Sequence, residues 1–170
     1  MVWLASELMF FGGLFASYFT IRAQTPEWPP AGVELEVLRD GIFTVVLVAS
    51  SFTMQIGERH LHRGNRSHAR RWILLTIALG MVFLANQIVE WFTLDFTGTT
   101  DAYGSLFFSL TGFHGLHVLL GLVVMVALLG RIVGPGPDPG DGPAAQVITY
   151  YWHFVDVVWL ALFAIIFLLQ

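Results

Sequence analysis

Ionisable and amide side chains lie inside otherwise apolar stretches of this sequence. The first is Glu7, within LASELMFFGGLFASYF at residues 4–19. The others are Asn86, Gln87, Glu90, His114, His117, His153 and Asp156. A charged group inside a lipid-spanning segment costs about 2.5–3.5 kcal/mol on insertion scales, so each such residue needs a partner or serves a function.

If these stretches are helices, their polar residues gather onto shared faces, because successive residues are about 100° apart. The third, fourth and fifth apolar stretches each carry one such face. The three faces consist of Thr76, Asn86, Gln87 and Glu90; of Thr111, His114, His117 and Gly121; and of Gln146, Thr149, Tyr150, His153 and Asp156. Polar faces turn toward one another rather than toward lipid, so we expect these three helices to pack through polar seams.

Two interpretations of the seams remain open. Neutral groups such as Asn86 and Gln87 are typical of interhelical hydrogen bonds, which stabilise a membrane bundle by about 0.6 kcal/mol each. The ionisable residues Glu90, His153 and Asp156 fit either such packing or a functional role. A neutral histidine bonded to Asp156 or Glu90 would satisfy both partners.

The histidine spacing also raises a metal-site hypothesis. His114 with His117, and His153 with Asp156, place possible ligands one helical turn apart. Di-metal sites in helical bundles usually combine two ExxH motifs with two further glutamates, and this sequence contains no ExxH. Cysteine is absent, which excludes thiolate ligands. We therefore expect no metal site, and a free-standing membrane metalloenzyme is the weaker alternative.

Glu7 belongs to a different helix from the three seams. Aromatic and bulky residues share its flank, namely Trp3, Phe11, Leu14 and Tyr18. The small pairs Gly12 with Ala16 and Gly13 with Ser17 point elsewhere, and small residues let another helix approach closely. We expect the tight helix contact on that small-residue flank, and Glu7 to face aromatic rings, a partner, trapped water or lipid. A carboxylate that snorkels to the inner surface is the alternative.

The elements that must position these residues are five apolar helices. The chain has 170 residues, of which 56% are hydrophobic and 12% charged, so it is far more apolar than a soluble domain. Runs at 3–21, 41–57, 72–92, 104–130 and 145–169 are each long enough to span a bilayer. We predict an all-α membrane bundle forming a single domain over 1–170. The first run lacks the flanks of a cleaved signal peptide, so we expect it to stay in the mature protein.

The arginines predict the orientation of this bundle. The chain has eight basic residues, all arginine, and five of them lie in the predicted loop 58–71. They are Arg59, Arg63, Arg66, Arg70 and Arg71. The positive-inside rule makes this loop a cytoplasmic anchor, together with loop 131–144, where the stretch GPGPDPGDGP disfavours regular structure. The amino terminus is then cytoplasmic and the carboxyl terminus outside. Nothing indicates nucleic-acid binding.

Four segments, in this order, resemble cytochrome c oxidase subunit III. They are SELMFFGGLFASYF (6–19), WPP (28–30), YGSLFFSLTGFHGLHVLLG (103–121) and YYWHFVDVVWLALF (150–163). The resemblance extends over essentially the whole chain. The five spans correspond to the third through seventh spans of the family's seven-span form.

The resemblance implies an accessory subunit of a proton-pumping cytochrome c oxidase of aerobic respiration, in a bacterial plasma membrane. It implies that this chain holds no catalytic residue and no cofactor, with haem and copper in the partner subunits. Catalytic subunit I is the expected direct partner, with subunit II in the same complex and phospholipid bound alongside. Glu7 matches the family's membrane-buried carboxyl, which is associated with proton uptake and a lipid cleft. A small proton or solute channel lined by the seams is the alternative function.

Overall fold

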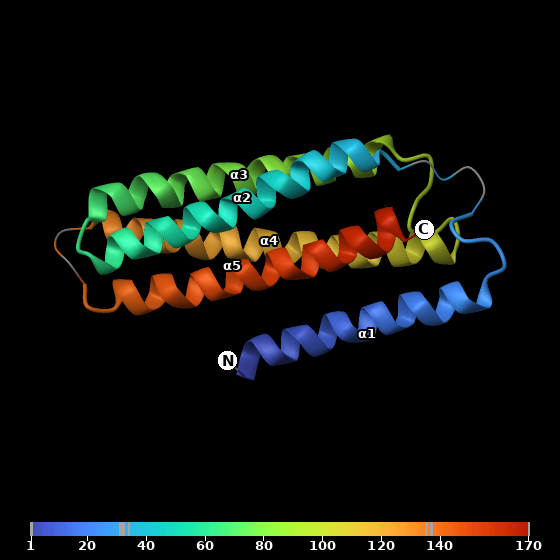
Figure 1. The fold of residues 1–170 in the computed structure, drawn as a ribbon, viewed down its shortest axis with the longest axis horizontal. Coiled ribbons are helices and arrows are strands. Elements are labelled where there is room, and N and C mark those ends of the chain that lie inside the picture. The colour runs from blue at the N-terminus through green and yellow to red at the C-terminus, as the bar shows by residue number, and fades with distance from the viewer. Residues whose placement is uncertain (1, 31–32, 34, 135, 137, 170) are drawn as a thin grey trace.

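Five long helices account for most of this chain. The computed structural model describes residues 2–30, 33, 35–134, 136 and 138–169. Its helices are α1 (Val2–Gln24), α2 (Val37–His62), α3 (Arg66–Thr93), α4 (Ala102–Val133) and α5 (Asp141–Phe163), and α5 continues into the short π-helix η1 (Ala164–Leu168) (Figure 1). All five long helices are apolar enough to cross a membrane, and the described ranges contain no strand. The all-α prediction is confirmed.

The helices run past the apolar stretches from which they were predicted. Only residues 63–65 separate α2 from α3, and the Asn65 side chain caps α3 by accepting a bond from the His68 N–H. Asp101 caps α4 in the same way at the N–H of Gly104, 2.7 Å away.

The end of GPGPDPGDGP is helical, contrary to expectation, because α5 begins at Asp141. Pro143 then lies in the first helical turn, where a missing N–H costs no hydrogen bond; residues 135 and 137 of this stretch lie outside the described residues.

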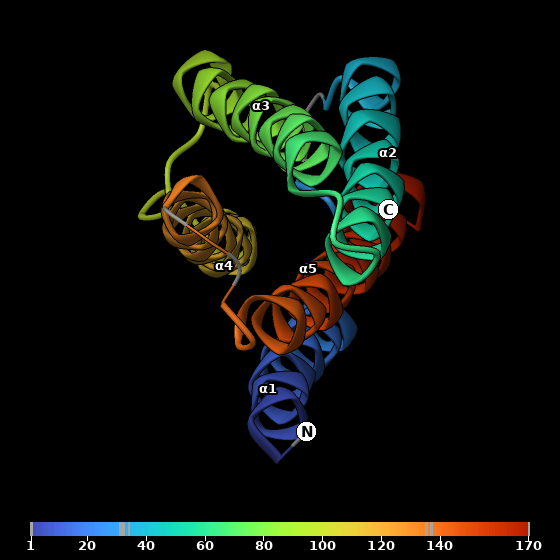
Figure 2. The same cartoon turned by 90° about the vertical axis from the view of Figure 1, so that its left-hand side faces the viewer.

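The end-on view shows α1 lying outside the other helices (Figure 2). α2, α3, α4 and α5 enclose the core, while α1 lies against α4 and α5. In α1, 11% of the most apolar window is buried inside the chain, compared with 50% in α5. Most of the surface of α1 is therefore open to lipid or to another protein.

Two tryptophans of α5 fill the centre of the four-helix core. Trp152 and Trp159 are almost completely buried. Glycines opposite Trp152 make room for its ring, since a Cβ at Gly121 would come within 2.7 Å of it and one at Gly80 within 3.0 Å. These two positions need glycine because of the close approach of an aromatic ring.

The predicted polar stripe of α5 is buried only along one edge. Thr149 and Asp156 are buried, whereas Gln146 and Tyr150 are exposed and His153 is half-buried. The centre of the buried face is occupied by larger apolar side chains, namely Tyr151, Trp152, Val155 and Trp159. Burying aromatic area stabilises the bundle more than burying this polar stripe would, so the helix is rotated away from the predicted orientation.

Candidate functional site

Glu7 forms a side-chain pair with His117, across the boundary between α1 and α4. Its Oε2 atom lies 3.0 Å from Nε2 of His117. The Glu7 side chain is 22% exposed and the His117 side chain 10% exposed. The expectation that Glu7 stands apart from the polar seams is therefore wrong, because its partner is a residue of the α4 seam.

The geometry of His117 requires a proton between the two side chains. Its Nδ1 atom lies 2.6 Å from the carbonyl oxygen of Phe113, and a carbonyl can only accept, so Nδ1 carries a hydrogen. Nε2 then has two ways to bond Glu7. It donates to the carboxylate if the imidazole is protonated, or it accepts from a protonated carboxyl. In both cases the pair holds one exchangeable proton.

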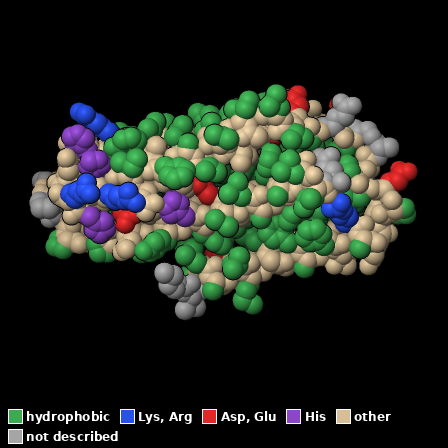
Figure 3. Space-filling view, viewed as in Figure 1, with side chains coloured by type: hydrophobic (Ala, Val, Ile, Leu, Met, Phe, Trp, Pro, Cys, Tyr) green, Lys and Arg blue, Asp and Glu red, His purple; other side chains and the backbone are tan. Residues whose placement is uncertain are grey.

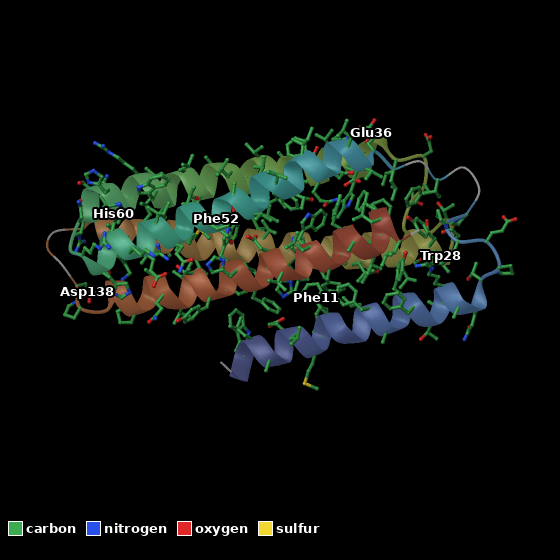
Figure 4. All side chains as sticks on the ribbon, in the orientation of Figure 1. Phe11, Trp28, Glu36, Phe52, His60 and Asp138 are labelled. Atoms are coloured by element: carbon green, nitrogen blue, oxygen red, sulfur yellow. The ribbon has the colours of Figure 1, made fainter. Side chains whose placement is uncertain are left out.

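Aromatic rings enclose the Glu7–His117 pair on the side of the bundle. Phe11 packs edge-on against the His117 ring with centroids 5.0 Å apart, and Figure 4 shows Phe11 pointing from α1 toward the bundle. The hydroxyl of Tyr151 donates to the backbone carbonyl of His117 over 2.9 Å, and Trp3 stacks on the Tyr151 ring. The pair thus lies at an aromatic boundary rather than inside the four-helix core.

The small-residue flank of α1 makes no tight contact within this chain. A Cβ placed on Gly12 or Gly13 would meet no atom within 4 Å, and Ala16 is exposed. The expected tight packing on this flank is therefore wrong for contacts inside the chain. α1 docks through the opposite flank, where Phe11 and Tyr18 are each 1% exposed, because burying aromatic area is the larger gain.

The polar residues of α3 and α5 find most of their partners on α2, which the sequence analysis did not single out. The hydroxyl of Ser51 donates to Asp156 Oδ2. Three further bonds of α2, at 2.8–2.9 Å, join Thr53 to Thr76, Ser50 to Trp152 and Thr44 to Trp159. The prediction that the seams of the last three helices pair with one another needs this correction.

The residue pattern of α2 did contain a signal that one face of this helix is buried. Asp40, Thr44, Leu47, Ser51 and Met54 are all buried, and they recur at intervals of three or four residues. That periodicity is typical of one helical face. Single hydroxyl groups among apolar residues gave too weak a contrast for the face to be recognised as polar.

The amide residues of α3 have two different environments. Gln87 is buried and its Nε2 atom donates to Glu90 Oε2 over 2.7 Å. Asn86 is half-buried at the edge of the face, where it accepts from Arg39 over 2.8 Å and donates to Asp40 over 3.2 Å. Glu90 is thus satisfied by an amide, and not by the histidine that the sequence analysis allowed.

His114 and His117 lie one turn apart but have different surroundings. His114 is completely buried, with Trp159 at a ring-centroid distance of 4.8 Å and Phe83 at 6.0 Å. Neither of its ring nitrogens has a hydrogen-bond partner among the described residues. In the described part of the chain, no three His, Asp, Glu or Cys side chains come together to hold a metal ion.

Of the five arginines predicted to anchor the cytoplasmic side, Arg66 contacts other helices and the other four are exposed. Arg66 lies 3.3 Å from Asp141 and also donates to the backbone carbonyl of Ile132, so it joins the start of α3 to the end of α4 and the start of α5. The exposed residues are Arg59, Arg63, Arg70 and Arg71. Arginine and histidine side chains gather at this end of the molecule, and hydrophobic side chains cover much of the middle of the same face (Figure 3).

Comparisons with known proteins give one consistent result. A family model described as cytochrome c oxidase subunit III matches residues 1–170. A relative named probable cytochrome c oxidase subunit 3, from Mycobacterium leprae, is 47% identical over 173 residues, which cover 99% of this chain and 85% of the relative. Relatives named cytochrome c oxidase subunit 3 are 45% identical in Corynebacterium diphtheriae and 36% identical in Thermostichus vulcanus, with the same coverage of both chains.

Proposed function

Because the chain belongs to the cytochrome c oxidase subunit III family, we propose that its Glu7–His117 pair, between α1 and α4, supports proton uptake by the oxidase. The chain is a multi-pass membrane protein and a non-catalytic, accessory subunit of the oxygen-reducing complex. The proposal concerns what this subunit contributes to that complex.

The observation that carries the proposal is the 3.0 Å contact between Glu7 Oε2 and His117 Nε2, from which we infer a shared proton. The pair lies outside the four-helix core, and the Glu7 side chain remains 22% exposed. A carboxyl and an imidazole can each accept or donate a proton without a change in the helices that carry them. A carboxyl in this setting is suited to exchanging protons with neighbouring water or with a partner chain.

The proposed orientation of the chain bears on where the pair could receive protons. We infer that the arginine-rich end is cytoplasmic, with the amino terminus inside and the carboxyl terminus outside. Glu7 then lies in the cytoplasmic half of α1. The exposed arginines Arg59, Arg63, Arg70 and Arg71 would contact phospholipid headgroups at the same surface.

The small-residue flank of α1 is the proposed binding surface for catalytic subunit I. Membrane helices associate closely through small residues, and Gly12, Gly13 and Ala16 have no such contact inside this chain. A helix seated here would lie on the opposite side of α1 from Glu7. Subunit II would belong to the same complex without contacting this flank. The partner subunits would hold haem and copper. Bound phospholipid would cover the remaining open surface of α1.

A matched pair of alanine substitutions tests this interface. Ala16 on α1 and Ala78 on α3 are both exposed, so Ala16→Leu and Ala78→Leu make the same chemical change on two helices. We expect Ala16→Leu to lower the recovery of this chain with tagged subunit I about tenfold, which corresponds to roughly 1.4 kcal/mol. Ala78→Leu should leave recovery unchanged. Equal recovery of both variants would contradict the proposed binding of subunit I to this flank of α1.

The hydrogen bonds give less support to the alternative of a channel through this chain. The polar groups of the described residues form separate clusters: Ser51 pairs with Asp156, and Gln87 and Glu90 lie near Asn86 and Asp40 at one end of the bundle. His114 lies between aromatic rings and has no hydrogen-bond partner among those residues. A proton path along the seams would need continuous hydrogen bonding at this position.

A further inference from the structure

Two carboxyl groups meet at the end of the molecule opposite the arginine-rich loop. Asp40 lies in the first turn of α2 and Glu90 in the last turn of α3, and their side chains are within hydrogen-bonding reach of each other. Both residues are nearly inaccessible, at 3% and 4% exposure. In Figure 4 the nearby Glu36 marks this end and His60 marks the other.

The hydrogen-bond donors around the two carboxyls leave one oxygen without a partner. Asn86 donates to Asp40 Oδ1 over 3.2 Å, and Gln87 donates to Glu90 Oε2 over 2.7 Å. Asp40 Oδ2 is buried and has no hydrogen-bond donor among the described residues. A buried carboxylate oxygen with no donor is costly, so we expect a bound proton or water molecule at this atom.

The described charged and titratable side chains that face Asp40 and Glu90 do not supply a hydrogen-bond donor to Asp40 Oδ2. Arg39 of α2 donates to Asn86 over 2.8 Å, and its nearest ion-pair partner is Glu36 at 3.5 Å. Tyr103 of α4 is near Glu90, but its hydroxyl has no hydrogen-bond partner in the described part of the chain. Asp40 and Glu90 therefore share a site that contains more negative charge than these neighbours neutralise.

A cavity of about 140 Å³ adjoins the two carboxyls. Its lining residues are Glu36, Arg39, Asp40, Glu90, Thr93 and Leu94. A volume of this size has room for several water molecules. The Glu36 side chain is 73% exposed, so water from outside the bundle can reach this space.

We propose that Asp40 and Glu90 bind one proton between them, as a carboxylic acid paired with a carboxylate at a water-filled cavity. Two buried carboxylates in contact repel each other, whereas one proton converts the contact into a charge-assisted O–H···O hydrogen bond. A proton fits this site better than a metal ion because only two carboxyls converge and the Arg39 guanidinium is close by. The site is separate from the Glu7–His117 pair and does not depend on the function of that pair.

Infrared difference spectroscopy of the purified oxidase complex tests this proposal. The substitutions are Asp40→Asn and Glu90→Gln, and Glu36→Gln is the matched control because Glu36 lines the same cavity but is exposed. At neutral pH, we expect each of the first two to remove the same carbonyl-stretch band of a protonated carboxyl. That band should shift in D2O, since water reaches the site. Glu36→Gln should remove carboxylate absorption alone.

Several results would overturn the proposal. Loss of carboxylate absorption alone in both variants would mean that both groups are ionised. A protonated-carboxyl band lost in one variant only would place the proton on a single residue. A shift of the wild-type carboxylate bands on adding sodium or calcium chloride would mean that a metal cation occupies the site.

The wild-type complex gives a second test that requires no substitution. Raising the pH should convert the protonated-carboxyl band into carboxylate absorption. The same conversion should be missing from whichever of the two variants assembles. A wild-type spectrum without such a conversion would contradict the shared proton.

Discussion

Asp156 and Glu7 are both intramembrane carboxyls with one close partner, but their settings differ. Asp156 is 5% exposed, lies between α2 and α5 and accepts a hydrogen bond from the hydroxyl of Ser51. Glu7 is at the outside of the bundle, and its partner is the imidazole of His117. The Ser51 hydroxyl donates to its partner, whereas an imidazole nitrogen can either donate or accept.

The difference favours a packing role for Asp156 and the proposed proton-exchange role for Glu7. A carboxyl fixed by a hydroxyl inside a tightly packed core contributes to stability, because its loss leaves a buried donor unsatisfied. A carboxyl paired with a titratable residue at a lightly packed boundary contributes little to stability and remains free to exchange a proton. Polarity alone did not distinguish the two residues in the sequence, but their surroundings do.

The largest expected effect on stability comes from the core. Asp156→Leu should lower the stability of the subunit by about 1–3 kcal/mol, because it leaves the Ser51 hydroxyl without its buried acceptor. Thermal unfolding of the complex in mild detergent, followed by retention of this chain, measures the loss. Asp156→Asn is the control, since it keeps an acceptor oxygen and should cost less. Equal retention of Asp156→Leu and wild type would contradict a packing role.

A smaller effect is expected at the outer attachment of α1. The indole N–H of Trp28 donates to the Tyr18 hydroxyl over 2.9 Å, and the indole ring packs against Tyr103. Trp28→Phe removes the hydrogen bond while keeping an aromatic ring, so it should cost about 1 kcal/mol. Hydrogen exchange should accelerate in residues 18–30 and stay unchanged in residues 145–162.

Tyr18→Phe checks the origin of that effect. It removes the same hydrogen bond from the other side, together with the 3.5 Å bond that the Tyr18 hydroxyl donates to the Ile165 carbonyl, so the double substitution should cost little more than Tyr18→Phe alone. Additive losses, or faster exchange in the core helices as well, would show that Trp28 acts through something other than the attachment of α1.

The sequence predicted the parts of this structure that depend on local pattern. Long apolar runs gave the five helices, and residue spacing correctly placed His114, His117 and Gln87 on buried faces. The stripe of α5 was misjudged because the spacing of polar residues such as Tyr150 was weighed above the aromatic bulk beside them. The spacing rule could not say which of two neighbouring faces packs inward.

Contacts between distant residues were beyond the reach of these patterns. Residues 7 and 117 are 110 positions apart, and no local spacing places one opposite the other. The same holds for Asp40 and Glu90, since Asp40 lies next to a predicted loop and was not counted among the intramembrane residues. Helix pairing decides both contacts, and pairing depends on the tertiary packing of all five helices.

The smallest expected effect on stability, and the most direct test of the proposed function, is Glu7→Gln. The amide can still bond His117, so assembly of the oxidase should match wild type, but the pair no longer holds an exchangeable proton. Glu27→Gln, at an exposed loop carboxyl, is the control. The measurement is the decay of activity during sustained turnover, together with the rate of proton uptake. We predict faster decay or slower uptake for Glu7→Gln alone, and decay and uptake identical to wild type in both variants would contradict the proposed function of the Glu7–His117 pair.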